Sequence, residues 1–162
     1  MAPGLALVVL VAGVSLVLSG CAKPTPLPPR DAVARYDKIA ADLKTALAPL
    51  VPSYAAPRQR GPAWEQGACT YTAGHFDPDP KRPGEDVFTD PAWPDVKASL
   101  NQVLTTQGFG ALGEPQRAGS GMDLFARDAH GAAFHLTDDG YFGVYGALAD
   151  TSDCTRANFG LD

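Results

Sequence analysis

Apolar residues recur at helical spacing in two segments of the chain. The first segment opens at Asp31, whose carboxylate suits the N-cap of a helix, and is ended by Pro49 and Pro52. Its apolar stripe consists of Val33, Tyr36, Ile39, Ala40, Leu43, Leu47 and Leu50. The second segment begins at Asp90-Pro91 and ends at Gly108. Its apolar face consists of Trp93, Val96, Leu100, Val103 and Leu104. The spacing predicts an amphipathic helix in each segment.

Four other segments have the pattern of β-strands. One short strand is expected over 68–73, and three more over 122–128, 133–137 and 141–148. Asp138-Asp139-Gly140 predicts a hairpin between the last two, because Asp-Gly suits the positive φ angles of such a turn. The order helix, strand, helix, three strands predicts an α+β fold. We expect a four-stranded, mainly antiparallel sheet with two helices packed on one face.

An apolar run over residues 5–18 precedes the first charged residue of the chain, Lys23. A run of this length is typical of the hydrophobic part of a signal peptide, and it is shorter than the ~20 residues that a transmembrane helix needs. The run leads into Leu18-Ser19-Gly20-Cys21, which resembles the bacterial lipobox. That resemblance implies a signal peptide over 1–20, cleavage before Cys21, and lipidation of the Cys21 thiol. The alternative is a plain secretory leader with a chance cysteine near its cleavage site.

A lipidated Cys21 would anchor the protein at the extracytoplasmic face of the cell membrane. The next residues, A-K-P-T-P-L-P-P-R, carry four prolines and predict an extended spacer of roughly 25–30 Å at ~3.1 Å per residue. The expected organisation is therefore a signal peptide (1–20), a lipidated cysteine with a tether (21–30), and a single α+β domain (31–162).

Charge and composition argue against a nucleic-acid partner and indicate the kind of genome that encodes the protein. The net charge is −5, and the basic residues are scattered along the chain. Because phosphate binding needs a concentrated basic surface, nucleic acid is not expected as a partner. Ile39 is the only isoleucine, while Ala, Gly and Pro are abundant, and this bias indicates a GC-rich, actinobacterial source.

Two cysteines remain once Cys21 is set aside. In an exported domain, Cys69 and Cys154 are expected to form a disulfide. The alternative, a reactive or metal-binding cysteine, lacks a neighbouring histidine or a second cysteine at short spacing.

The arrangement of these elements is similar to that of the LppA-type small lipoproteins of mycobacteria. An early-strand cysteine, a tryptophan-led helix, a glycine and a terminal Asp-Cys pair carry the likeness. These features are Cys69, Phe88, Trp93, Gly108 and Asp153-Cys154. That family has no assigned activity, so the resemblance implies a class of lipoprotein and no reaction.

Catalytic motifs are not found in this sequence. No serine lies in a G-x-S-x-G turn, and no glycine-rich phosphate loop precedes a helix. The sequence therefore predicts a protein that is not an enzyme and has no cofactor or metal. The alternative is a small metal-dependent hydrolase that uses His75, Asp77 and Asp79, whose nitrogen and oxygen atoms suit a cation.

Aromatic residues in the predicted meander suggest a binding surface. Phe125, Phe134, Tyr141 and Tyr145 occupy both faces of neighbouring strands, so one set is expected to remain exposed. His135 lies between Phe134 and Leu136 and is expected on the opposite face. We interpret the protein as a non-catalytic binding or accessory module of the envelope that binds a protein or an apolar ligand. The alternative is that these rings only cover a small sheet.

Overall fold

The two helices lie where the apolar spacing predicts them. The computed structural model describes residues 23–82 and 84–161, so the predicted signal peptide and Cys21 lie outside the described residues. Helix α1 spans Pro29–Leu47 and helix α2 spans Trp93–Thr106. Within the described residues, no helix combines the length and the apolar character needed to cross a bilayer.

Both helices begin at residues other than those predicted. Helix α1 starts at Pro29, because the fixed φ angle of proline suits the first helical position. Asp31 therefore lies in the first turn, where a carboxylate is favourable beside the positive end of the helix dipole. Asp90 precedes α2 and accepts a 2.8 Å hydrogen bond from the Ala92 amide, so it caps a turn that leads into the helix.

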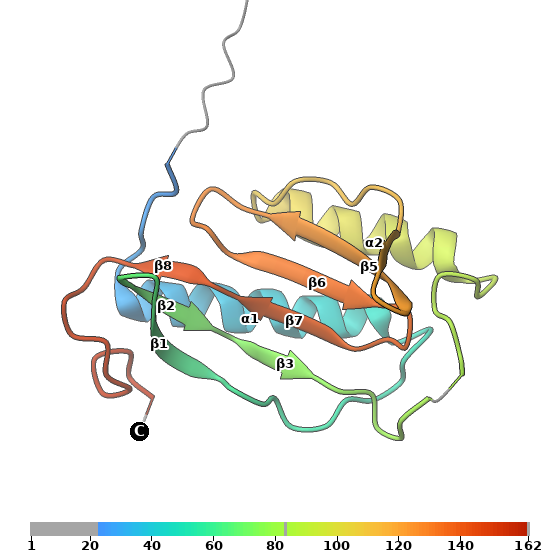
Figure 1. Ribbon diagram of the computed structural model, residues 1–162, viewed down its shortest axis with the longest axis horizontal. Coiled ribbons are helices and arrows are strands. Elements are labelled where there is room, and N and C mark those ends of the chain that lie inside the picture. The colour runs from blue at the N-terminus through green and yellow to red at the C-terminus, as the bar shows by residue number, and fades with distance from the viewer. Residues whose placement is uncertain (1–22, 83, 162) are drawn as a thin grey trace, which may run out of the picture.

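Eight strands form two antiparallel sheets in the described part of the chain (Figure 1). The strands are β1 (Gly61–Glu65), β2 (Ala68–Thr72), β3 (Gly74–Phe76), β4 (Gln116–Ala118), β5 (Gly121–Arg127), β6 (Ala133–Thr137), β7 (Phe142–Tyr145) and β8 (Ala147–Ala149). One sheet has the order β1-β2-β8, and the other has the order β3-β7-β6-β5-β4. The α+β class and the antiparallel pairing are confirmed, while the prediction of a single four-stranded sheet is wrong.

The two sheets meet where the β2–β3 segment and the neighbouring β7–β8 segment are both interrupted. One residue separates β2 from β3, and one separates β7 from β8. The pairing keeps its register across the break, with Tyr71 opposite Ala147 on one side and Gly74 opposite Val144 on the other. Gly146 has a φ angle of 78°, a left-handed conformation that interrupts the strand. The strand predicted at the end of the meander is therefore two strands.

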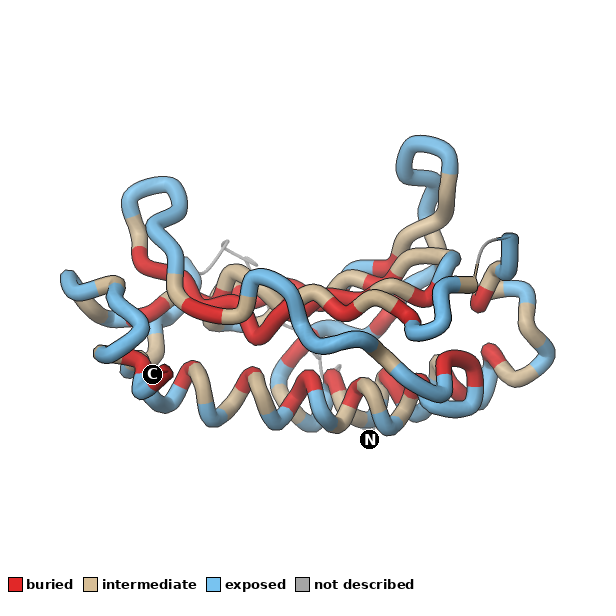
Figure 2. The backbone as a smooth tube through the Cα atoms, turned by 90° about the horizontal axis from the view of Figure 1, so that it is seen from below, coloured by how far each residue is buried: buried red, intermediate tan, exposed pale blue. Residues whose placement is uncertain are grey.

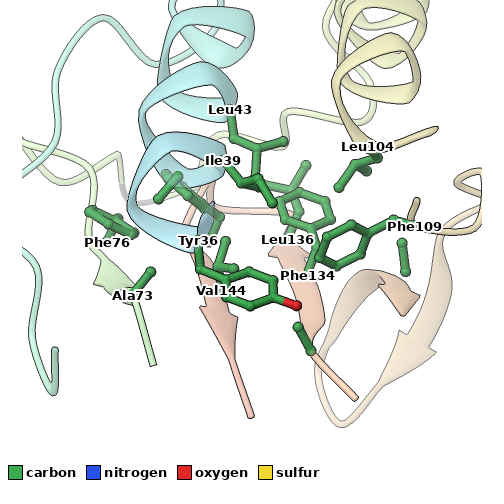
Figure 3. Close-up of a cluster of buried hydrophobic side chains, with 14 of the residues drawn as sticks. Tyr36, Ile39, Leu43, Ala73, Phe76, Leu104, Phe109, Phe134, Leu136 and Val144 are labelled. Carbon is green, nitrogen blue, oxygen red and sulfur yellow. The ribbon is translucent and has the colours of Figure 1, made fainter. Parts of the chain in front are cut away.

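The hydrophobic core lies between the helices and one face of the sheets. Figure 2 shows α1 running beneath the sheets, and Figure 3 shows side chains from both helices and from the strands meeting in one cluster. Tyr36, Ile39 and Leu43 enter this cluster from α1, and Leu104 enters it from α2. The prediction that both helices pack on one face is confirmed.

A disulfide joins the start of β2 to the segment after β8. Cys69 and Cys154 are bonded with a Cα–Cα distance of 5.6 Å, which confirms the predicted pair. Nearby, the ring of Phe159 stacks on Tyr71 with a centroid distance of 5.8 Å. The C-terminal segment is thus held against the outer edge of the core.

The proline-rich segment before α1 is bound to the fold, so the prediction of a free-standing tether up to residue 30 is wrong. The Thr25 amide donates to the Ala129 carbonyl at 2.8 Å, and the Leu27 amide donates to Leu148 at 3.0 Å. Leu27 also forms a parallel bridge with Ala149. Between Pro24 and Pro29, Thr25 and Leu27 are the residues that possess an amide hydrogen, and both use it.

Candidate binding surface

The face of the five-stranded sheet that points away from the helices is not covered by another layer in the described structure (Figure 2). Strand alternation places a connected set of ring-bearing side chains on this face. The set consists of His75 from β3, Phe125 from β5, His135 from β6, Tyr141 from the turn before β7, and Tyr145 from β7. We call these five residues the aromatic–histidine face.

Phe134 does not belong to this face, so its predicted place in the binding surface is wrong. Its side chain is 0% exposed and lies in the core beneath both helices (Figure 3). Phe134 pairs across the ladder with Ala126 and Val144, which are also buried. His135 lies on the face opposite Phe134, as predicted, because neighbouring residues on a strand point to opposite faces, and in the structure that face is the one that points away from the helices.

Phe125 is the most exposed member of the face. The residue is 48% exposed. Among the described residues, the only other large apolar side chain that is similarly exposed is Trp64. The Phe125 ring lies parallel to the His135 ring, at 4.4 Å between centroids and 1° between planes. The imidazole thus supports one side of the phenyl ring and leaves the other side open to solvent.

The remaining rings continue from this pair across the sheet. His75 stacks on Tyr145 at 5.5 Å and on Tyr141 at 5.9 Å, and its Nδ1 shares a hydrogen bond with the Tyr141 hydroxyl. His135 meets Tyr141 edge-on at 5.9 Å. The five side chains therefore form one connected series of ring contacts, although their residues come from three regions of the chain.

Gly143 lies under the centre of the face and makes this stacking possible. It pairs with His75 on one side and with His135 on the other. A Cβ atom at this position would lie 3.0 Å from His75 Nδ1 and 3.2 Å from a ring carbon of Tyr145. The absence of a side chain at residue 143 lets both rings lie close to the sheet.

Charged groups flank the rings at two points. Asp123 Oδ2 lies 3.1 Å from His135 Nε2, with both side chains largely buried, although the contact is not aligned as a hydrogen bond. At the other end, Arg58 forms a two-pronged ion pair with Asp77, with its Nε 2.6 Å from Oδ2. Each end of the face therefore carries a carboxylate next to a cationic or protonatable group.

The environment of the face favours the neutral forms of His75, Tyr141 and Tyr145. Burial lowers the pKa of His75 below its ordinary value, and the positive charge of Arg58 and the proximity of His135 lower it further. Burial likewise raises the pKa of Tyr141 and of Tyr145. At neutral pH His75 and the two tyrosines are thus uncharged, polar and aromatic.

Two surface hollows adjoin the face on either side of Tyr145. One has a volume of about 460 Å³ and lies beneath the β1–β2 hairpin, where its lining includes Glu65, Tyr145 and Arg127. The other has a volume of about 500 Å³, and its lining includes His75, Tyr145 and Arg156. Figure 2 shows exposed hairpins rising from this side of the sheets. Tyr145 and Glu65 thus line both depressions, whose walls are partly polar.

The residues of the alternative metal site do not converge. His75 is in β3 and shares its Nδ1 with Tyr141, while the Asp77 carboxylate is paired with Arg58. Over residues 23–82 and 84–161, no three His, Cys, Asp or Glu side chains form a group that could hold a metal ion. The geometry therefore offers no support for the hydrolase hypothesis.

Sequence reasoning found three of the five residues of the face. The sequence predicts Phe125, Tyr141 and Tyr145 for a binding surface, whereas it suggests His75 only for the alternative metal site and places His135 only on the face opposite Phe134. The pairing of β3 with β7 brings His75 among them. No local signal marks this pairing, because the two strands are more than 60 residues apart in sequence.

Comparison with protein-family models, with curated proteins and with solved structures finds no match to this chain.

Proposed function

We propose that this protein is a membrane-anchored, extracytoplasmic lipoprotein whose domain is a non-catalytic binding module. The anchor is supported by the apolar run that ends at Leu18-Ser19-Gly20-Cys21. The disulfide between Cys69 and Cys154 supports an oxidising compartment, because such bonds persist mainly outside the cytosol.

The observation that carries the binding role is the exposed Phe125 ring on its His135 support. An apolar ring held rigidly at the surface loses little conformational entropy on binding, and aromatic residues are enriched at protein interfaces. His75, Tyr141 and Tyr145 extend the surface with rings that also carry hydrogen-bonding atoms. Such rings provide contact area and polar specificity together.

An envelope protein fits this surface better than a small apolar ligand. Apolar ligands bind in pockets lined mainly by hydrophobic side chains. The two hollows beside Tyr145 instead have charged walls: Glu65 lines both, with Arg127 in one and Arg156 in the other. An apolar centre with a polar rim is the usual composition of a protein–protein interface.

The anchor is tested by measuring the intact mass of protein purified from its native membrane. We expect an N-terminus at Cys21 with added diacylglyceryl and acyl mass, and release of a Cys21→Ser variant from the membrane fraction. Protein with an unmodified Cys21 that still pellets with membranes would contradict the proposal.

The binding surface is tested by a photo-crosslinking amino acid placed at Phe125 in living cells. The matched control places the same group at Gln102, which is exposed on α2 and faces away from the sheets. We expect a discrete adduct from position 125 that is lost when Tyr145 is replaced by serine. Equal adducts from positions 125 and 102, or an adduct insensitive to Tyr145→Ser, would contradict the proposal.

A further inference from the structure

The segment that leads back towards Cys21 is fastened to one end of the domain. Thr25 and Leu27 donate their amides to Ala129 and Leu148, and the Leu27 carbonyl accepts from the Asp150 amide at 2.8 Å. His130 Nδ1 donates to the Thr25 carbonyl at 2.7 Å. The chain is therefore held beside the β5–β6 turn, which we define as residues 128–132 (Figure 1).

Only a short stretch of chain separates this attachment from the proposed lipid anchor. A chain spans at most about 3.6 Å per residue, so Lys23 lies within about 7 Å of Cys21, and Thr25 within about 14 Å. These limits are set by covalent geometry and hold for any conformation of the intervening residues. A lipid on Cys21 would thus be no more than about 14 Å from the first fastened residue.

We infer that the β5–β6 turn lies against the phospholipid headgroups and that the domain is seated on the bilayer by this end. The inference rests on the proposed lipidation of Cys21. It replaces the expectation of a spacer that holds the domain 25–30 Å away, because the part of that spacer from Thr25 onward is held by the fold.

Hydrogen bonds of Asp128 connect the β5–β6 turn to helix α1, so the position of the turn determines that of the whole domain. The Asp128 carboxylate accepts the amides of His130 and Ala132 at 2.9 and 3.0 Å, and the Tyr36 hydroxyl at 2.6 Å. The Asp128 side chain is 1% exposed, so the turn presents no carboxylate to headgroup phosphates. Because Tyr36 of α1 is bonded to Asp128, a turn held at the membrane also sets the orientation of the rest of the domain.

This placement also locates the aromatic–histidine face. Phe125 precedes Ala129 by four residues along β5, which corresponds to about 14 Å of extended strand. The proposed binding surface would therefore stand close to the bilayer, within reach of partners that are themselves bound to the membrane.

The test uses single labelling cysteines at two ends of the same strand. Ala129→Cys lies in the β5–β6 turn, and Ser120→Cys lies in the turn before β5; both residues are exposed. In the lipidated protein, Cys21 is blocked and Cys69 is bonded to Cys154, so a fluorophore reacts with the introduced thiol. The labelled protein is placed in phosphatidylglycerol–phosphatidylethanolamine vesicles that carry a nitroxide on the lipid headgroup.

We expect several-fold stronger quenching at residue 129 than at residue 120. Equal quenching at both residues, in protein whose mass shows a lipidated Cys21, would overturn the inference and leave the anchor intact. A mass that shows an unmodified Cys21 would overturn the proposed function itself and this inference with it.

A variant pair tests whether the fastening causes the placement. Thr25→Pro with Leu27→Pro removes both amide donors, whereas Thr25→Ala with Leu27→Ala keeps the donors and loses only the native side-chain atoms beyond Cβ. We expect the proline pair to lower quenching at residue 129 towards that at residue 120, and the alanine pair to preserve the difference. Preserved quenching in the proline pair would contradict the role of these hydrogen bonds.

Discussion

The hydroxyl of Tyr36 in α1 donates a 2.6 Å hydrogen bond to the carboxylate of Asp128, the first residue of the β5–β6 turn. Both side chains are almost fully buried. Burial raises the pKa of Tyr36, and the hydrogen bond to Asp128 raises it further, so the hydroxyl remains a donor at any physiological pH. This bond connects the helix to the turn that holds the N-terminal segment.

Replacing Tyr36 with phenylalanine should therefore destabilise the domain. Hydrogen bonds to charged groups contribute about 1.5–3 kcal/mol, and the free energy of unfolding should fall by about that amount in Tyr36→Phe. The control is Tyr54→Phe, because Tyr54 donates to the neutral carbonyl of Gly140 at 3.1 Å and should cost only about 0.5–1.5 kcal/mol. Chemical denaturation at pH 7 measures both, and equal losses in the two variants would contradict the assigned strength of the Asp128 bond.

Removal of the disulfide should also lower stability strongly. The bond between Cys69 and Cys154 closes a loop with a sequence separation of 85 residues. For a loop of this size, the chain-entropy model gives about 4.6 kcal/mol, within a general range of about 2–5 kcal/mol. We expect a loss of that size when both cysteines are replaced by alanine. Wild-type protein unfolded under reducing conditions is the control and should match the variant; a difference below about 1 kcal/mol from the oxidised protein would contradict the prediction.

Acidification should weaken the fold through His75. Its pKa is lowered in the folded state by burial, by Arg58 and by His135, whereas the unfolded chain has the ordinary value of about 6.5. Below pH ~6.5 the unfolded state therefore binds more protons, and the free energy of unfolding decreases as the pH falls through the folded-state pKa. Above pH ~6.5 the stabilising contribution of neutral His75 is fully present.

The contribution of His75 is isolated by comparing wild type with His75→Gln in urea titrations between pH 8 and pH 5. Both proteins keep His130 and His135, so the difference between the two pH profiles belongs to residue 75. We expect the wild type to lose more stability on acidification than the variant. Parallel profiles would show that His75 is not responsible.

A side chain at residue 143 should disturb the aromatic–histidine face. In Gly143→Ala, the new Cβ would lie 3.0 Å from His75 Nδ1 and 3.2 Å from the Tyr145 ring, so the rings must move apart. Overpacking of this kind costs about 1–3 kcal/mol. Gly113→Ala is the control, because a Cβ there meets no atom within 4 Å. Unfolding measurements and the chemical shifts of the His75 and Tyr145 rings should separate the two variants, and unchanged ring shifts in Gly143→Ala would rule out this packing.

Local patterns in the sequence predicted those parts of the fold that neighbouring residues determine. The helices follow from apolar residues that recur every three or four positions, as in the stripe that contains Tyr36, Ile39 and Leu43. The hairpin at Asp138-Asp139-Gly140 follows from its glycine, because Gly140 adopts a φ angle of 85°. Strand alternation also correctly separated the outward His135 from its neighbours.

Strands with little apolar alternation were missed. Strand β1 contains Pro62, which is tolerated because β1 is an edge strand. Its last three residues, 63–65, are exposed. Strand β4 is exposed along its length and is ordered by its pairing with β5. Neither segment has a buried face of its own, so no local hydrophobic pattern could reveal it.

The sequence by itself determined the two helices, the antiparallel meander, the α+β class and the pairing of Cys69 with Cys154. Only the tertiary structure decided which aromatic rings are exposed, and it brought His75 to Tyr141 and Tyr145 through the pairing of β3 with β7. It also decided that Thr25 and Leu27 belong to the domain, because their partners are more than 100 residues away in sequence. Periodicity and turn chemistry act over a few residues, whereas strand pairing and docking depend on contacts between distant segments, which no local pattern encodes.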